Sequence, residues 1–353
     1  MQEILSCFCA GNSPTIAQLE QLLARELSRS LQAKAFDLDR DNGFDKIKRR
    51  SQLLITVYPE IAALADKYGL LPREDRFLLS LWDLWLPLAI QLAEARADLG
   101  RTLVQGILGG QGTGKTTLTT ILSLILSHLG YSTLAVSIDD LYKTYQEREL
   151  LQQQDPRLIW RGPPGTHDVK LGIEVLELCC QESSENSILV PRFDKSAYNG
   201  AGDRADFESV EKPDLVLFEG WFTGARPLEG TIFENSLPFP IITEKDRLFA
   251  KDNNERLKEY IPLWEKLDRL IVLYPTDYRL SKQWRKEAEQ KMKASGKSGM
   301  SDAEIEDFVD YFWRSLHPEL FINPLVNNPD LVDLVIEINS DRSLGKIYKP
   351  GEY

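Results

Sequence analysis

The spacing of apolar residues divides the chain into two parts. Residues 1–98 show the three-to-four-residue period of helices, whereas from residue 101 short apolar runs alternate with helical stretches. The runs that predict strands are TLVQGIL, TLAVSI, ILVPRF, DLVLFEG, LIVLY and LVIEI. Strands of this length, apolar on both faces and separated by helices, are typical of a mostly parallel sheet covered on both sides. We therefore expect an α/β domain over 99–353, preceded by a helical region over 1–98.

Three helices are expected in the N-terminal region. Ser13 and Pro14 have the form of an N-cap and first-turn pair for the first. The second covers about 45–67 and the third about 73–98. Pro87 marks a point where the third helix can kink. We find no catalytic pattern in this region.

The most apolar stretch of the chain, FLLSLWDLWLPLAIQLA, lies in the third of these helices. It carries Asp83 and Pro87 and is short for a membrane span, so it is interpreted as a buried helix. Trp82 and Trp85 within it are expected in the core rather than against a ligand. No membrane partner is expected.

Composition narrows the classes of partner. The chain has 353 residues, with 42 Lys and Arg against 54 Asp and Glu, a net charge of −12. Nucleic acid is therefore not an expected partner, since phosphate backbones are bound by basic faces, whereas a small anion can still bind at a local basic cluster. The start MQEILSCFCAGNSP lacks the pattern of a signal peptide. Four cysteines without disulfide or zinc spacing further predict a reducing, cytoplasmic setting: Cys7, Cys9, Cys179 and Cys180.

A phosphate-binding motif follows the first predicted strand. GGQGTGKT, residues 109–116, fits G-x-x-x-x-G-K-[ST] and is followed by the helical stretch TTLTTILSLILSHL. In such a loop, backbone N–H groups and the helix N-terminus surround phosphate oxygens. Lys115 is expected to reach the β- and γ-phosphates and Thr116 to bind Mg²⁺. The expected ATP contacts are Gly109, Gly110, Gln111, Gly112, Thr113, Gly114, Lys115, Thr116 and Thr117.

The nucleotide and the class of reaction follow from what surrounds this motif. No Asn-Lys-x-Asp or Thr-Lys-x-Asp run, the usual guanine-reading pattern, follows the late strand LIVLY. ATP is therefore favoured over GTP. A small-molecule kinase is favoured over a motor, because ATP-driven motors are more often larger.

Two carboxylates stand at the ends of predicted strands. Asp139 in SIDDLY follows the second strand, where ligands of open α/β sheets bind, and could accept the proton of an attacking hydroxyl. Asp140 is instead expected to cap the next helix. Glu219 ends DLVLFEG and is expected, with Thr116, to hold the metal ion.

Several motifs together resemble the plant and cyanobacterial type of D-glycerate 3-kinase, a family related to phosphoribulokinase, uridine kinase and pantothenate kinase. They are GGQGTGKTT, SIDDLY, WRGPPGTHD, VPRFDKSAYNGAGDRAD, LFEGW and WRKEAEQKMKASGKSGMSDAEIEDFV. The resemblance covers about residues 100–345. It implies a P-loop kinase fold, phosphorylation of D-glycerate to 3-phosphoglycerate with ATP and Mg²⁺, and a role in photorespiration. It also implies that Asp139 is the catalytic base.

The acceptor loops are rich in charge. A small acid such as glycerate requires cations for its carboxylate and hydrogen-bond partners for its hydroxyls. The residues expected to bind it are Arg161, His167, Asp168, Arg192, Lys195 and Arg204. The sequence does not rank the arginines as carboxylate partners.

A basic segment follows the late strand. Residues 279–297 hold seven Lys or Arg and two Glu. Related kinases place a lid here that closes over ATP, so a lid is expected over about 279–300. Arg285, alone or together with Arg279, is the candidate that stabilises the transferred phosphoryl group. A solvated helix face is the plainer interpretation.

Two other functions stay open on the sequence alone. One is a P-loop kinase acting on pantothenate, a nucleoside or a phosphosugar. The other is a non-catalytic ATP-binding regulator, which the joint presence of Lys115, Thr116, Asp139 and Glu219 disfavours. The sequence does not predict the oligomeric state, the regulation, or the role of residues 1–98.

Overall fold

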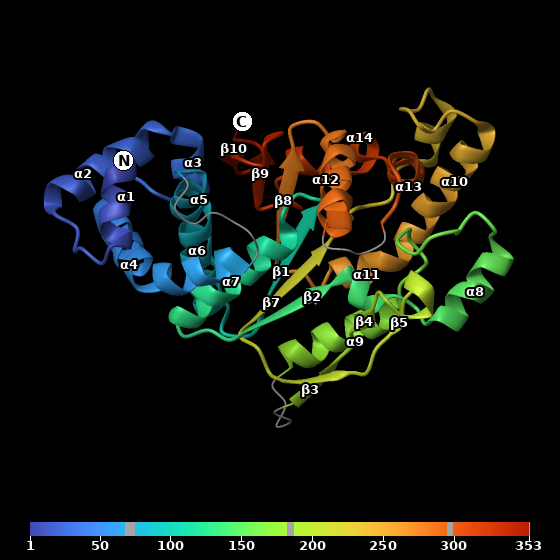
Figure 1. The fold of residues 1–353 in the computed structure, drawn as a ribbon, viewed down its shortest axis with the longest axis horizontal. Helices are drawn as coiled ribbons and strands as arrows, with labels where there is room; N and C mark the ends of the chain where they lie inside the picture. The colour runs from blue at the N-terminus through green and yellow to red at the C-terminus, as the bar shows by residue number, and fades with distance from the viewer. Residues whose placement is uncertain (68–74, 182–186, 295–298, 353) are drawn as a thin grey trace.

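Helices of the N-terminal region pack at one side of a central sheet (Figure 1). The computed structural model describes residues 1–67, 75–181, 187–294 and 299–352. The N-terminal elements are α1 (Gln2–Cys9), α2 (Ile16–Ser28), α3 (Ser30–Ala35), α4 (Gly43–Lys67), α5 (Asp75–Ser80), the π-helical turn η1 (Leu81–Trp85) and α6 (Leu86–Leu99). The predicted helical segment is confirmed, although the expected start of its third helix lies outside the described residues.

The N-cap of α2 differs from the expected one. Thr15 caps this helix: its Oγ1 accepts a hydrogen bond from the Gln18 amide at 3.3 Å, and Gln18 Oε1 accepts one from the Thr15 amide at 2.9 Å. This reciprocal pair satisfies two amides that the helix cannot. Ser13 has Ile16 three residues later, which cannot return the bond, so the Ser13–Pro14 prediction was wrong.

The central sheet has six strands in the order β10-β9-β8-β1-β7-β2. All neighbouring pairs are parallel except β9 and β10, which are antiparallel. Its strands are β1 (Leu103–Gly109), β2 (Thr133–Ser137), β7 (Leu215–Gly220), β8 (Arg269–Pro275), β9 (Leu334–Ile338) and β10 (Leu344–Tyr348). Every residue of β1 is buried, as expected for a central strand of a covered parallel sheet. The predicted α/β fold is confirmed.

The expected strand ILVPRF does not join this sheet. Its first half is β3 (Ser187–Val190), which pairs antiparallel with β6 (Glu208–Glu211) in a separate ribbon. Phe193 begins a second, two-residue ribbon formed by β4 (Phe193–Asp194) and β5 (Asp203–Arg204). Pro191, which has no amide hydrogen to donate, separates β3 from β4. The segment therefore lies in two small ribbons outside the central sheet and is not a core strand.

Helices and short turns fill the remaining connections. They are α7 (Lys115–His128), η2 (Ile138–Leu141), α8 (Tyr145–Gln154), α9 (Val169–Cys180), η3 (Tyr198–Gly200), η4 (Gly230–Glu234), α10 (Glu244–Arg256), η5 (Leu257–Tyr260), α11 (Ile261–Trp264), α12 (Leu280–Ala294), α13 (Asp302–Ser315), α14 (Pro318–Phe321) and η6 (Leu325–Asn327). Ser301 caps α13 in a capping box with Glu304. Figure 1 shows α8 and α10 at the opposite end of the molecule from α1–α4.

The N-terminal helices and one face of the sheet share a single hydrophobic core. Leu103 and Ile107 of β1 belong to the same buried cluster as Leu5, Leu22 and Leu92 of the N-terminal helices. The alternate β1 residues face the other side, where they join the clusters that involve α9, α11 and α14. The helical region therefore covers apolar surface of the sheet and does not form a core of its own.

The helical stretch Asp75–Leu99 is long and apolar enough to cross a membrane by length and composition alone. Within the fold, 72% of its most apolar window is buried, as is typical of a core helix. Trp82 is fully buried, as expected, but Trp85 is only half-buried. The interpretation as a buried helix is thus confirmed for this stretch, with Trp85 as the exception.

A π-helical turn marks the place where Pro87 was expected to perturb the helix. Proline cannot donate a backbone hydrogen bond, so the carbonyl four residues earlier, that of Asp83, loses its helical partner. Gln32 Nε2 donates to this carbonyl at 2.8 Å. In the turn, the Leu86 amide instead bonds to the carbonyl of Leu81, five residues back. Pro87 therefore reshapes the backbone one turn ahead of itself.

Candidate active site

The P-loop connects β1 to α7. Gly112 and Gly114 have φ values of 78° and 90°, in the left-handed region that favours glycine. A Cβ on Gly112 would also lie 2.5 Å from Cβ of Trp284 in α12, which is too close for any other residue. The local sequence thus sets both the loop conformation and its contact with the predicted lid.

Lys115 lies folded back inside this loop. Its Nζ donates to the carbonyls of Gly109 and Gly110 at 2.7 and 3.1 Å. Burial lowers the pKa of Lys115, while the nearby charges of Glu219 and Asp139 oppose that shift. All residues predicted to contact ATP lie in this loop or in the first turn of α7. A phosphate bound there would offer Lys115 a stronger partner than backbone carbonyls.

The edge of the sheet brings two carboxylates to the P-loop. β2 and β7 are adjacent and parallel, with Ser137 paired to Glu219, and Asp139 follows two residues later. Thr116 Oγ1 donates to Glu219 Oε1 at 3.1 Å. Glu219 Oε2 is buried without a hydrogen-bond partner in the described structure.

The free oxygen of Glu219 bears on the expected metal site. Burial raises the pKa of this carboxyl, against the opposing effects of Lys115 and Thr116. Among the described residues no group of three His, Cys, Asp or Glu could hold a metal ion. Thr116 and Glu219 fit Mg²⁺, which proteins commonly bind through one or two oxygen ligands plus substrate phosphates and water.

The pKa of Asp139 is shifted in the opposite direction to that of Glu219. Burial acts to raise the pKa of Asp139. Lys195, whose Nζ lies 2.7 Å from Oδ2, and the Tyr142 hydroxyl lower it by more than burial raises it. The net pKa of Asp139 lies below its ordinary value, so this carboxylate is ionised at neutral pH. It can therefore accept a proton from a hydroxyl brought beside the P-loop.

His167 presents one nitrogen to this region. The Tyr260 hydroxyl accepts a hydrogen bond from the Gly165 amide at 3.0 Å and lies 2.7 Å from His167 Nδ1. The Tyr260 hydroxyl can in turn donate to Nδ1, and in that tautomer the imidazole hydrogen is on Nε2. That nitrogen is buried and has no partner in the described structure. Burial lowers the pKa of His167 to about 3, so the ring is a neutral donor.

Two of the predicted arginines are already paired with carboxylates. Arg192 contacts Asp140 at 3.2 Å and Glu208 at 2.7 Å. Arg204 contacts Asp168 at 3.1 Å. Binding of the acceptor by Arg192 and Arg204 stays a prediction. Their charges are partly neutralised by these carboxylates within the protein.

The acids in these pairs also have structural roles. Asp168 is the N-cap of α9, since its Oδ1 accepts a hydrogen bond from the Leu171 amide at 3.1 Å. Asp140 accepts one from the Ser137 amide at 2.9 Å in a capping box, as the cap prediction for it implied.

Arg161 and an arginine that the sequence analysis missed, Arg148, are in a different state. In the described part of the chain each donates to backbone carbonyls and neither has an ion pair: Arg161 reaches Gly200 and Ala201 at 2.8 and 2.9 Å. Arg148 reaches Ala201 at 2.8 Å and also bonds to the Gly202 carbonyl. Burial and the charge of Arg161 lower the pKa of Arg148. Two adjacent cations without a carboxylate are suited to an anionic ligand.

Arg161 also belongs to the aromatic cluster around Asp139. Its guanidinium lies 5.8 Å from the ring centre of Tyr142 and 5.4 Å from that of Phe193. Tyr142 in turn stacks on His167 with ring centres 4.6 Å apart. Arg161, His167 and Asp139 therefore surround one ring. No motif marked Arg148 or Tyr260; only the long-range packing brings them here.

The basic segment is largely engaged with acidic residues. Lys282 pairs with Asp310 and Lys286 with Glu306, both of α13, at 2.7 and 2.8 Å. Arg285 pairs with Glu289 of its own helix, α12, and lies over the ring of Phe308 at 5.3 Å. The phosphoryl role of Arg285 stays a prediction. Of the lid predicted over about 279–300, residues 295–298 lie outside the described residues.

Arg279, the second arginine considered for that role, lies 3.4 Å from Asp277 and over the ring of Tyr278 at 4.7 Å. The described contact between the lid and the P-loop is made by Trp284, through Gly112.

Known kinases resemble this chain in sequence and in structure. No family model matches the chain. The chain is 34% identical over 254 residues to the chloroplastic D-glycerate 3-kinase of Arabidopsis thaliana, a match covering 68% of this chain and 53% of that protein. The chain thus spans about half the length of that relative.

Two yeast relatives are covered more fully. The uncharacterized kinase mug58 of Schizosaccharomyces pombe is 31% identical, with 68% of this chain and 90% of that protein covered. The probable ATP-dependent kinase TDA10 of Saccharomyces cerevisiae is 30% identical, with 61% and 75% covered.

Solved structures show the same relationship. A D-glycerate 3-kinase from Cryptococcus neoformans superposes with a TM-score of 0.65 at 27% identity, covering 74% of this chain and 99% of that one. The YGR205w protein gives a TM-score of 0.64 at 26% identity, covering 75% and 96%. The chain belongs to the family of P-loop kinases that includes the D-glycerate 3-kinases.

Proposed function

We propose that this kinase transfers the γ-phosphoryl group of ATP to a hydroxyl of D-glycerate and releases ADP and 3-phosphoglycerate. The observation that carries the proposal is the ionised Asp139 beside the P-loop, with Arg161 and the Nε2–H of His167 around the same aromatic ring. The names of the plant and fungal relatives support D-glycerate as the acceptor.

The reaction assigns a task to each group. Asp139 accepts the proton as the acceptor oxygen bonds to phosphorus and the bond to the ADP oxygen breaks. Lys115 neutralises charge on the phosphates from its place in the P-loop. Arg161 binds the carboxylate of glycerate, and His167 donates to an oxygen of the acceptor. Positioning and charge stabilisation account for most of the rate in such transfers.

We propose that Thr116 and Glu219 hold Mg²⁺ together with the nucleotide. A bound Mg²⁺ supplies positive charge that offsets the charge of the β- and γ-phosphates. The partnerless Oε2 of Glu219 supports this assignment. All four cysteines are free, which supports our proposal that the enzyme works in a reducing compartment such as the cytoplasm.

A panel of acceptors tests the proposal. Purified protein with MgATP is offered D-glycerate, glycerol, pantothenate, nucleosides and phosphosugars, and the phosphorylated position is read by ³¹P NMR. D-glycerate should be used far better than glycerol, which has similar hydroxyls but no charge. Equal use of glycerol, or preference for a nucleoside or a phosphosugar, would contradict the proposed substrate.

The role of Asp139 is tested by Asp139→Asn. This change keeps the size of the side chain but removes the base, so kcat should fall by roughly 10²–10⁴-fold while ATP affinity is retained. The matched control is Asp206→Asn, an exposed aspartate between β5 and β6 without a role in the proposed chemistry. A folded Asp139→Asn protein with nearly unchanged kcat would place the base elsewhere.

A further inference from the structure

A pocket of about 360 Å³ borders the P-loop and is walled partly by the N-terminal helices. Its size is within the range of small-molecule sites, roughly 300–1,000 Å³. Phe77 of α5 with Leu84 and Trp85 of η1 form one wall, and Arg342 of the turn between β9 and β10 lies on another. The acceptor-side residues described above do not line it.

The pocket is continuous with the phosphate site. Gly114 and Thr117 belong to both the P-loop region and the lining of the pocket. Thr116, between them, turns its hydroxyl to Glu219 on the acceptor side. A polyphosphate chain in the loop therefore has its reacting end near Glu219 and Asp139, and its other end meets the pocket.

The wall offered by the N-terminal helices is aromatic. Phe77 and Trp85 meet edge to face, with ring centres 5.2 Å apart and planes at 73°. Phe77 is buried, whereas Trp85 keeps part of its ring accessible at the pocket. A flat heteroaromatic base is the part of a nucleotide that gains most from contact with such a ring.

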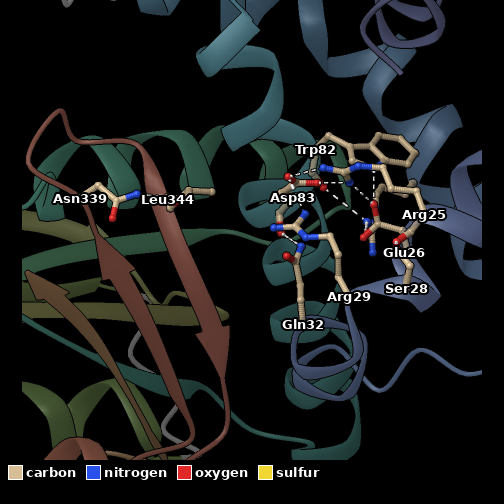
Figure 2. A network of polar contacts seen from close by, with 10 residues as sticks. Arg25, Glu26, Ser28, Arg29, Gln32, Trp82, Asp83, Asn339 and Leu344 are labelled. Atoms are coloured by element: carbon tan, nitrogen blue, oxygen red, sulfur yellow. Dashed lines mark hydrogen bonds and ion pairs between the residues drawn. The ribbon is translucent and has the colours of Figure 1, made fainter. Parts of the chain in front are cut away.

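A buried ionic network fixes the wall in place. Figure 2 shows Arg25 and Arg29 converging on Asp83, which precedes Leu84 in η1. Arg25 makes two hydrogen bonds to this carboxylate, at 2.7 and 2.9 Å. Trp82 Nε1 donates to Glu26 at 3.0 Å. Both sides of the π-helical turn are thereby held by α2.

The other walls of the pocket are also anchored. Arg342 pairs with Glu287 of α12 at 2.7 Å and lies over the ring of Trp284 at 5.6 Å. Arg76 donates to the carbonyl of Asp341, which ties α5 to the turn between β9 and β10. The pocket is thus formed before a ligand arrives, which lowers the entropic cost of binding.

We propose that the N-terminal helices complete the nucleotide site, and that α5 and η1 receive the adenine base of ATP against Phe77 and Trp85. The proposal rests on ATP as the phosphate donor in the proposed function. It gives the N-terminal region a part in substrate binding in addition to its part in the core. It also explains why Trp85, unlike Trp82, is left partly accessible.

Titration calorimetry with two ligands tests the proposal. MgATP carries the base, whereas Mg-tripolyphosphate occupies the phosphate loop without one. In Trp85→Leu and Phe77→Leu, affinity for ATP should fall by roughly 5- to 150-fold, the effect of losing an aromatic contact with a base. Affinity for tripolyphosphate should stay unchanged. The matched control is Phe36→Leu, because Phe36 is as buried as Phe77 and belongs to the N-terminal region but does not line the pocket.

Unchanged ATP affinity in both folded variants overturns the proposal, and so does an equal loss for the two ligands. If the variants fail to fold, amide exchange of the wild type decides: ATP should slow exchange over residues 75–85 more than tripolyphosphate does, and equal protection overturns the proposal. If the protein binds neither ATP nor tripolyphosphate, then ATP is not the phosphate donor, and this proposal fails together with that assignment. ATP binding without transfer to glycerate overturns the proposed substrate alone.

Discussion

At the scale of single residues, the charges around Asp139 set the acid side of the pH profile. Lys195 lowers the pKa of Asp139 against a burial effect that raises it. In Lys195→Met the burial effect meets less opposition, so the pKa rises and Asp139 is protonated at a higher pH. The acid limb of kcat/KM should therefore move to higher pH.

The limb is measured from the pH dependence of kcat/KM, which reports the free enzyme. Lys170→Met is the control, because Lys170 is 88% exposed and pairs with Glu174 on α9. A limb that stays in place in Lys195→Met, or moves to lower pH, would contradict the assignment of Asp139.

The arginines can be ranked by their partners. In the described structure Arg161 donates its hydrogen bonds to backbone carbonyls and pairs with no carboxylate, whereas Arg192 is held by two carboxylates. Arg161→Met should therefore lower kcat/KM for glycerate by roughly 10- to 150-fold, the effect of losing one charged hydrogen bond, and should leave the slow reaction with glycerol nearly unchanged. Arg192→Met is the comparison. A larger glycerate-specific loss in Arg192→Met would reverse the ranking.

Sequence alone could place some of these residues and not others. The P-loop and Asp139 stand at fixed positions relative to predicted strands, so spacing and strand order locate them. The partners of Arg192 and Arg161 depend on where loops from distant parts of the chain meet. The same packing brings Arg148 and Tyr260 to the site, and no local pattern records it.

At the scale of elements, the π-helical turn depends on the carboxylate of Asp83. This side chain is 7% exposed and faces Arg25 and Arg29, which are 28% and 32% exposed. Asp83→Ala leaves Arg29 without its carboxylate and Arg25 with Glu26 as its remaining acidic partner, and should lower the free energy of unfolding by about 3 kcal/mol.

Chemical denaturation measures the effect. Arg49→Ala is the matched control from the same N-terminal region: its pair with Glu94 is 48% and 45% exposed, so its loss should cost less than about 1 kcal/mol. Equal effects of the two substitutions would show that the network adds no more than a surface pair.

Helices and strands were predicted well where a long run of residues repeats the apolar spacing of that element. Apolar spacing predicted α2, α4, the helical stretch Asp75–Leu99, α7 and the strands of the central sheet other than β10, since burial imposes that spacing. It did not predict α1, α3, α8, α9 or α10. ILVPRF has the apolar pattern of a strand, but the pattern does not show which strand it pairs with. That depends on the segment beside it in the fold, which is β6 and not a strand of the central sheet. For the π-helical turn, the sequence offered one signal, Pro87. The effect of a proline on the backbone depends on which side chain bonds to the freed carbonyl, and that side chain, Gln32, comes from another helix.

At the scale of the whole molecule, the shared core makes the N-terminal region indispensable for solubility. A chain that begins at residue 99 would expose the sheet face that carries Leu103 and Ile107, together with one side of α7. Such a surface promotes association. We expect this truncated protein to aggregate, as measured by its soluble fraction and sedimentation. A soluble, fully active truncation would contradict both the shared core and the proposed base wall.

The meeting of α3 with β10 also bears on how the chain reaches this structure. These elements pack together, and Lys349 pairs with Asp37 at 2.6 Å across 312 positions of sequence. Contacts between such distant segments make folding slow, because a large loop must close before they form. During synthesis the first helices emerge long before their partner strand, with their apolar sides uncovered. We therefore expect nascent chains of this kinase to depend on chaperones until the last strand is available.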